Sequence, residues 1–148
     1  MSEYDPIERA PSIDQSNANR LRRIGILRVG DVLRVPIDEI TADLRQFGIT
    51  SEMVISWQRQ IRLMCQVRGL RSYDARVLVA CGITGPEQLL EMNASALRNR
   101  VREFSVTAEG QAILLSGTQA ELSRVTEWIQ GSRNWIPEMR QTRSRTAA

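Results

Sequence analysis

Apolar residues recur at helical spacing along nearly the whole of this chain. In residues 36–47, apolar side chains stand at i, i+3, i+7 and i+10, at Ile37, Ile40, Leu44 and Phe47. Because an α-helix repeats every 3.6 residues, this spacing places all four side chains on one face. The pattern predicts an all-α fold in which the helices bury apolar stripes.

The stripe recurs later in the chain, at Ala94, Leu97, Val101 and Phe104. Each member follows its counterpart at the same offset that separates Gly82 from Gly25. A buried face repeated at a constant offset indicates an internal repeat, since the packing recurs as well as the letters. We therefore predict two tandem helical units related by internal duplication.

Helix-stopping and helix-starting residues separate the elements within each unit. Gly82 suits the left-handed position that follows a helix over residues 73–81. Thr84 and Glu87 form a capping box, with Pro86 in the first turn of a helix over residues 86–92. Asn93 is a good N-cap for the next helix. These signals predict short helices joined by tight turns.

A longer helix is predicted to connect the two units. It should be capped by Thr50 or Ser51 and should end near Val67. Its expected buried face consists of Val54, Trp57, Ile61 and Met64. No Gly- or Pro-rich linker interrupts it, so we predict that the two units pack as one compact domain.

The predicted organisation has four parts. Residues 1–10 form a disordered acidic head, residues 11–67 the first helical unit, residues 68–133 the second, and residues 134–148 an Arg-rich flexible tail. Trp57 and Trp128 are expected to be equivalent core anchors, and they stand further apart than the common offset, which predicts an insertion in the second unit. Thr118 and Glu121 would restart a helix after it. Trp135 either folds back onto the core or contacts another protein.

Composition places the chain among ordinary globular proteins. It has 148 residues, of which 42% are hydrophobic and 25% charged, enough to bury a good core. No apolar run approaches the roughly 18–20 residues that span a bilayer. The polar N-terminus does not resemble a secretory signal. We expect a cytoplasmic protein that does not bind a membrane.

The side-chain chemistry argues against catalysis and metal binding. The chain has no histidine, which removes the commonest general base. Cys65 and Cys81 stand among apolar residues, where a thiol is expected to fill space, and two cysteines are too few for a zinc site. We expect a protein that is not an enzyme and that has no metal and no cofactor.

The net charge of +3 is unevenly distributed. Residues 1–16 carry four acidic residues against one arginine, a net charge of −3, whereas residues 133–148 carry four arginines against one glutamate. The middle of the chain is nearly balanced and lacks the broad basic field of most nucleic-acid-binding proteins. All twenty basic residues are arginine, which we attribute to codon bias rather than to selection for guanidinium groups.

Two stretches resemble known sequence patterns. Residues 67–83 resemble a helix-hairpin-helix motif, with Val67, Gly69, Leu70, Ala75 and Leu78 at its apolar, glycine and alanine positions and Arg71 at its second glycine. Residues 82–90, GITGPEQLL, together with WI at 128–129, resemble a bacterial domain family of unknown function built from tandem helix-hairpin-helix units. That resemblance covers residues 11–133 and implies a helical architecture without an assigned role.

The helix-hairpin-helix resemblance implies contact between a glycine hairpin and a nucleic-acid phosphate. The candidate residues for such contact are Arg68, Gly69, Leu70, Arg71 and Ser72. The first unit lacks both hairpin glycines, and its Asp14 would repel a phosphate. Arg20, Arg23 and Arg28 form a secondary candidate basic patch, for which a solvated helix face is the alternative.

Two functions remain open at this stage. We favour a non-catalytic module that binds a protein partner, because the hairpins are degraded and the central charge is balanced. The alternative is binding to the DNA or RNA backbone, independent of base sequence, through the Gly69–Arg71 hairpin. A small ligand between the two units has no sequence feature in its support.

Overall fold

The computed structural model describes residues 1–67 and 69–115, with the backbone alone at positions 39–41. The described part of the chain is all-α, as predicted, with an isolated antiparallel bridge between Pro6 and Arg28. Its elements in chain order are η1 (Ile7–Arg9), α1 (Gln15–Arg23), α2 (Val29–Leu33), α3 (Ile37–Gln46), α4 (Ser51–Gln66), α5 (Ser72–Ala80), α6 (Pro86–Glu91), α7 (Ala94–Ser105) and α8 (Ala108–Leu115).

The helices begin at two sets of positions that share one offset. Helices α5, α6, α7 and α8 start at the same distance along the chain after α1, α2, α3 and α4 respectively. The turn between α1 and α2 and the turn between α5 and α6 each contain a left-handed glycine, Gly25 with φ +88° and Gly82 with φ +90°. In both turns the following isoleucine amide bonds back into the preceding helix, Ile26 to the Leu21 carbonyl and Ile83 to the Leu78 carbonyl.

The capping threonines recur at the same offset. Thr50 Oγ1 accepts a hydrogen bond from the Met53 amide at 3.2 Å at the start of α4. Thr107 Oγ1 accepts one from the Gly110 amide at 2.9 Å at the start of α8. A threonine cap satisfies one of the amides that a helix start leaves without an intrahelical partner. The local chemistry of these helix starts is therefore shared between the two halves of the described chain.

The predicted caps of the two helices after Gly82 have different outcomes. Asn93 is confirmed as the cap of α7, since its Oδ1 accepts from the Ala96 amide at 2.7 Å. The predicted capping box of Thr84 and Glu87 is wrong. Gly85 is the N-cap of α6, and the Thr84 amide donates instead to Gln88 Oε1 at 2.8 Å. The glutamine one position further along makes the contact that Glu87 was expected to make.

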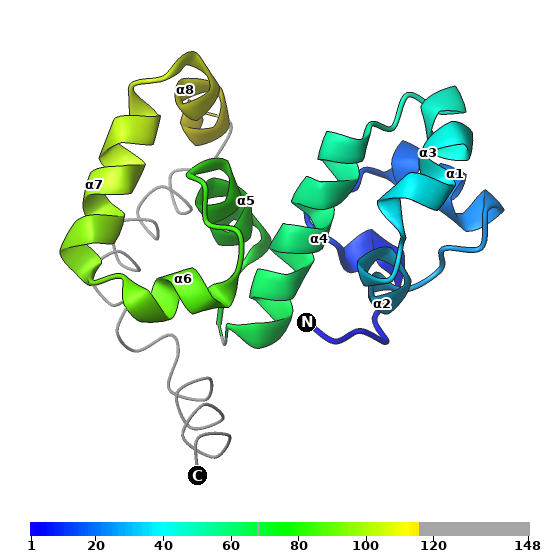
Figure 1. The fold of residues 1–148 in the computed structure, drawn as a ribbon, viewed down its shortest axis with the longest axis horizontal. Helices are drawn as coiled ribbons and strands as arrows, with labels where there is room; N and C mark the ends of the chain where they lie inside the picture. The colour runs from blue at the N-terminus through cyan, green and yellow to red at the C-terminus, as the bar shows by residue number, and fades with distance from the viewer. Residues whose placement is uncertain (68, 116–148) are drawn as a thin grey trace, which may run out of the picture.

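The apolar side chains form two clusters instead of the single core that the sequence predicts. One contains side chains from η1 to α4, among them Ile7, Val29 and Ile61. The other contains side chains from α4 to α7, among them Leu63, Leu78 and Leu97. Figure 1 shows α4 running between the two groups of helices. The expectation of one continuous core was therefore wrong, and α4 contributes side chains to both clusters.

Helix α4 packs one of its faces against the first cluster and another face against the second. Trp57 and Ile61 pack into the first cluster, whereas Leu63 and the C-cap Val67 pack into the second. Successive residues of an α-helix are rotated by about 100°, so Ile61 and Leu63 point to nearly opposite sides. The predicted bounds and the Thr50 cap of this helix are confirmed. Met64, expected on the same face as Trp57, packs against the second cluster instead.

Residues 1–10, for which the sequence predicts disorder, are hydrogen-bonded to the loop before α2 and to the first turn of α2. The Ile7 amide donates to the Leu27 carbonyl at 3.2 Å, and the Val29 amide donates to the Asp5 carbonyl at 2.9 Å. Ile7 is fully buried in the first cluster. The head is acidic in composition, but backbone pairing and the buried Ile7 anchor it to the rest of the first unit.

Several expectations lie outside the described residues. They are the insertion restart at Thr118, the anchors Trp128 and Trp135, the end of the second unit and the Arg-rich tail over residues 134–148. Within the described ranges, no helix is long and apolar enough to cross a membrane.

The C-terminal end of α7 leaves no room for a side chain at Gly110, in the first turn of α8. A Cβ at that position would overlap the backbone carbonyl of Phe104. We expect Gly110→Ala to destabilise the fold by about 2 kcal/mol, because overpacking against backbone exceeds the ~1 kcal/mol that alanine gains in a helix. Urea unfolding followed by circular dichroism measures this loss.

Gly85→Ala is the matched control. Gly85 has extended backbone, and an added Cβ would meet only the flexible end of Glu87. Gly85→Ala should lower the free energy of unfolding by less than Gly110→Ala does, because the cost is limited to that of alanine at an N-cap, about 1 kcal/mol or less. Equal stability of the two variants would show that the α7–α8 turn is not packed as described.

Candidate functional site

The predicted phosphate-binding hairpin lies between α4 and α5. Gly69 has φ +79° and is exposed, so its conformation favours glycine. Leu70 is 8% exposed and belongs to the second cluster. Arg71 and Ser72 are exposed at the start of α5. The structure thus brings these four candidates together, and Arg68 lies outside the described residues.

Arg71 stands at the second glycine position of the motif without backbone strain. Its φ of −98° is an ordinary extended conformation for the N-cap residue of a helix. The positive φ that would disfavour a side chain occurs at Gly69 instead. Replacement of the second glycine therefore carries no conformational penalty here.

The hairpin amides at Leu70 and Arg71 are engaged within the protein. The Arg71 amide donates to Asp74 Oδ2 at 2.9 Å, and the Leu70 amide donates to the Val67 carbonyl at 3.4 Å. Asp74 is only 1% exposed. A ligand at this hairpin could contact the Arg71 guanidinium. The Arg71 backbone amide, however, already donates to the Asp74 carboxylate. Sequence reasoning overlooked Asp74, although an acidic residue three positions after an N-cap is a recognisable signal.

At the start of α1 the capping carboxylate is on the N-cap residue itself, whereas at α5 it is three residues after the N-cap. There Asp14 is the N-cap, and its Oδ1 accepts from the Asn17 amide at 2.7 Å. Asp14 and Asn17 are the counterparts of Arg71 and Asp74 at the common offset. Both hairpins therefore use a carboxylate to cap the following helix, and both place a negative charge where a phosphate would have to approach.

Ser12 occupies the position equivalent to Gly69. It has φ +65°, a left-handed conformation that costs a non-glycine residue about 1 kcal/mol or more. Its Oγ donates to Gln60 Oε1 at 2.8 Å. Gln60 is 3% exposed, and its Nε2 donates to Ser56 Oγ at 3.0 Å. A polar network therefore ties the first hairpin to the middle of α4.

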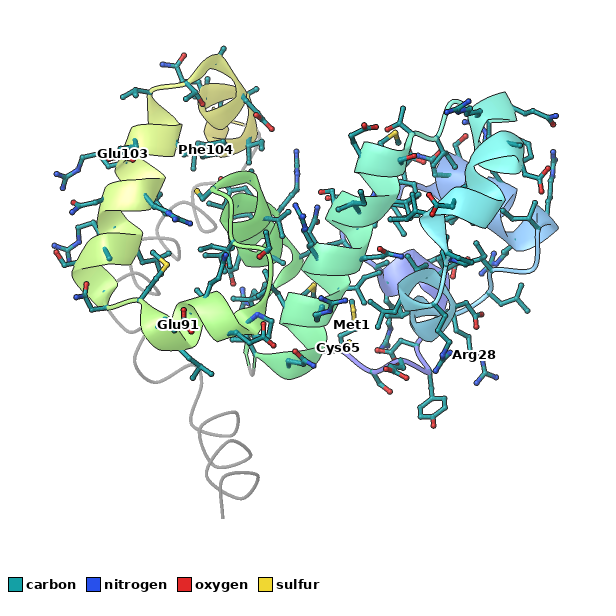
Figure 2. All side chains as sticks on the ribbon, in the orientation of Figure 1. Met1, Arg28, Cys65, Glu91, Glu103 and Phe104 are labelled. Atoms are coloured by element: carbon teal, nitrogen blue, oxygen red, sulfur yellow. The ribbon has the colours of Figure 1, made fainter. Side chains whose placement is uncertain are left out.

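The hairpin hollow, a shallow space of about 540 Å³, lies beside Gly69 and Arg71 and is also lined by Met1 and Cys65. Figure 2 labels Met1 and Cys65 at the lower end of α4. Burial raises the pKa of the Cys65 thiol, and the amino terminus of Met1 opposes this. The thiol is consequently protonated near neutral pH and is not an activated nucleophile.

Burial shifts the pKa of the second cysteine in the same direction. Burial raises the pKa of the Cys81 thiol to about 11, although Arg100 favours the thiolate. Both cysteines are free. Within the described residues, no three Cys, Asp or Glu side chains gather as a metal site would require.

The secondary patch does not present three equivalent arginines. Arg20 is half-buried, and its Nη1 donates to the Phe47 carbonyl at 2.8 Å, at the C-terminal end of α3. A cation at this end of a helix stabilises it. Arg23 and Arg28 are exposed. Figure 2 places Arg28 beside α2, where its amide donates to Asp31 Oδ2 at 2.9 Å. Arg20 thus has a structural partner.

Two further hollows lie along α4, between the two groups of helices. The α4–α5 hollow, about 400 Å³, is lined by Ser12, Trp57, Arg59, Gln60, Arg76 and Glu109 together with apolar neighbours. The α4–α6 hollow, about 340 Å³, is lined by Arg59, Arg62, Gly85 and Glu87 among others. We call the two hollows together the inter-unit groove, and Arg59, Arg62 and Arg76 the groove arginines.

Sequence reasoning missed this groove. Arg59 and Arg76 come from different helices, and no motif joins them. The ion pairs among the described residues all lie within positions 3–34, between Arg9 and Asp5, Arg22 and Glu8, Arg34 and Glu3, and Arg34 and Asp31. In that described part of the chain, no carboxylate lies within ion-pair distance of the groove arginines.

One family model matches most of the chain. The model of a family described as "Domain of unknown function (DUF4332)" matches residues 11–134. No curated protein matches the chain. No solved structure matches it either.

The raised pKa of Cys81 has a consequence for stability at alkaline pH. The folded thiol titrates at about 11 against its ordinary 9.0, so the folded state holds this proton more tightly than the unfolded state. Stability should therefore be unaffected below pH 9 and should fall as the pH rises from 9 to 11. The measurement is the urea midpoint at pH 8 and at pH 10.5.

Cys81→Ala supplies the comparison, since every other titrating group is unchanged. The variant should be less stable than the unmodified protein at pH 8, because a partly buried side chain is shortened. It should lose less stability between the two pH values. Parallel losses in both proteins would mean that Cys81 is not desolvated as described.

Proposed function

We propose that this chain, which belongs to the domain-of-unknown-function family DUF4332, is a non-catalytic helical module that binds a protein partner. The observation that carries the proposal is the internal use of the Leu70 and Arg71 hairpin amides. A helix-hairpin-helix that grips phosphate through its backbone needs those amides free. In this chain the Asp74 carboxylate and the Val67 carbonyl accept them.

The architecture supports two tandem helix-hairpin-helix-like units that arose by duplication. The helix starts, the threonine caps and the left-handed Gly25 and Gly82 recur at one offset. Ser12 and Gly69, the residues at the tips of the two hairpins, also share a left-handed conformation. Under this proposal the hairpins have become structural joints, and binding has moved to other surfaces.

The described side chains support a role without catalysis. The Cys65 and Cys81 thiols are kept protonated by burial, so neither is poised as a nucleophile. The sequence contains no histidine. Free cysteines also suit a reducing compartment, which supports a cytoplasmic location.

Backbone binding to nucleic acid is the second candidate, and one observation favours it. Gly69 and Arg71 are exposed at the hairpin hollow, which Met1 also lines. The Arg71 guanidinium and the amino terminus of Met1 would then face a phosphate together. The nearby Asp74 weakens this arrangement, because it holds the Arg71 amide.

A salt titration tests the second candidate. Fluorescence anisotropy with mixed-sequence DNA and RNA at about 50 mM salt should show no binding, because backbone contact at this hairpin is already satisfied internally. The contrary result would be binding that weakens with a slope near 0.9 per phosphate on duplex DNA and is lost in Arg71→Glu. Arg45→Glu, at an exposed position on α3, is the control for net charge.

Affinity purification from the native cell tests the first candidate. We expect the tagged full chain to retain a defined protein partner equally well with and without nuclease, since the contact is between proteins. Loss of every co-purifying protein after nuclease treatment would show that nucleic acid bridges them. A chain that retains nothing would contradict the binding-module proposal itself.

A further inference from the structure

The geometry points to the inter-unit groove as a site for an acidic, extended segment of the partner protein, recognised by Arg59, Arg62 and Arg76. This inference rests on the proposed function and names the surface and the chemistry of the contact. The groove is defined by the residues that line its two hollows, several of which come from α4, and Figure 1 shows α4 running between the two groups of helices. Its arginines come from α4 and α5.

The α4–α5 hollow is large enough to receive side chains of a ligand. Its volume of about 400 Å³ is within the range of ligand pockets, which are roughly 300–1,000 Å³. Gln60, 3% exposed, lines it and is held in place by Ser12 and Ser56. The Gln60 Nε2 carries two hydrogens, and among the described residues it donates one of them, to Ser56 Oγ, so the other can be donated to a ligand carboxylate or carbonyl.

Positively charged side chains outnumber negatively charged ones among the described residues that line the groove, which favours an anionic ligand. Arg59 and Arg62 are exposed and Arg76 is half-buried, and none has a carboxylate partner in the described part of the chain. A guanidinium that has lost part of its water binds a carboxylate more strongly than a fully hydrated one, and its planar fork can bind both carboxylate oxygens. Arg76, reinforced by Arg59 across the hollow, therefore favours a carboxylate ligand.

The two hollows share one lining side chain. Arg59 lines both of them, and Arg62 stands close to one helical turn further along α4, about 4.5 Å away along the axis. An extended peptide lying along α4 can thus place successive acidic side chains at Arg59 and Arg62. Arg76 lines the same hollow as Arg59 from α5.

Two features favour a peptide over a nucleic acid. Glu109 and Glu87 line the α4–α5 and α4–α6 hollows, and both would repel a backbone that carries a charge at every phosphate. Single-stranded nucleic acids also need exposed aromatic side chains on which their bases stack. Among the described residues that line the groove, the aromatic one is Trp57, which is 3% exposed and packs in the first cluster. A peptide can place uncharged residues opposite the glutamates.

Fluorescence anisotropy on the full chain tests the site. The probe is a fluorescein-labelled peptide in which glutamate alternates with glycine, and the comparison peptide has glutamine in place of glutamate. The glutamate peptide should bind at low salt and the glutamine peptide should not. The double variant Arg59→Gln/Arg76→Gln should bind about tenfold more weakly or worse, since each lost carboxylate contact is charge-assisted.

The matched control is Arg45→Gln/Arg98→Gln, which removes the same charge from exposed positions on α3 and α7. Its affinity should remain within about twofold of the unmodified chain, because exposed charges away from the peptide are screened. Equal weakening in the two double variants would show non-specific attraction. Failure of the glutamate peptide to bind at all would also overturn the inference. Tighter binding of oligothymidylate, lost in Arg59→Gln/Arg76→Gln, would assign the groove to nucleic acid.

The same variants separate this inference from the proposed function. Affinity purification with Arg59→Gln/Arg76→Gln as bait should lose the partner, whereas the control double variant should keep it. A partner kept by both variants would leave the binding module standing and overturn the groove as its site. Circular dichroism of each variant establishes that the loss is not due to unfolding.

Discussion

Helix α4 is sixteen residues long and contributes buried side chains to both hydrophobic clusters. Trp57 and Ile61 pack against the head and the first helices, and Leu63 and the C-cap Val67 pack against the helices that follow. Each of these side chains is at most 3% exposed. Truncating a leucine or isoleucine in such a place costs about 2–5 kcal/mol, a large part of the stability of a small domain. Both halves of the described chain therefore depend on the same helix.

This constraint also determines where polar groups occur. Between its two buried sides α4 carries Gln60, which is almost fully buried and hydrogen-bonded to Ser12 and Ser56. Ser12 adopts a left-handed backbone conformation where it makes this contact. On the remaining side α4 presents Arg59 and Arg62 to the hollows between the units. A helix shared by two cores leaves a groove along its uncovered side, and the polar residues there determine what the groove can bind.

The sequence predicted the parts of the fold that depend on local rules. Hydrophobic spacing and caps located α4 and α7, and left-handed glycines marked the ends of α1 and α5. The two cores were not predicted, because periodicity shows that α4 has apolar residues but not that Ile61 and Leu63 belong to different clusters. Residues 1–10 were predicted to be disordered because their composition is acidic and polar. Ile7 is nevertheless buried, because the head forms backbone hydrogen bonds with residues 27–30.

The candidate site shows the same division between local and tertiary information. The sequence located the Gly69–Arg71 hairpin, since the motif is contiguous, but not the acceptance of its Arg71 amide by Asp74. It could not locate the groove, because Arg59 and Arg76 meet only through the packing of α4 against α5. Arg20, assigned to a basic patch, binds the Phe47 carbonyl at the end of α3. A charged residue close in sequence to others can have a distant structural partner.

Amide hydrogen exchange across α4 tests the shared helix most directly. Leu63→Ala removes a side chain from the second core alone, and Ile61→Ala removes one from the first core alone. If α4 couples the cores, each substitution should accelerate exchange throughout α4 and in the helices of both cores. Acceleration confined to one core, with the other core and its side of α4 exchanging as before, would contradict the account.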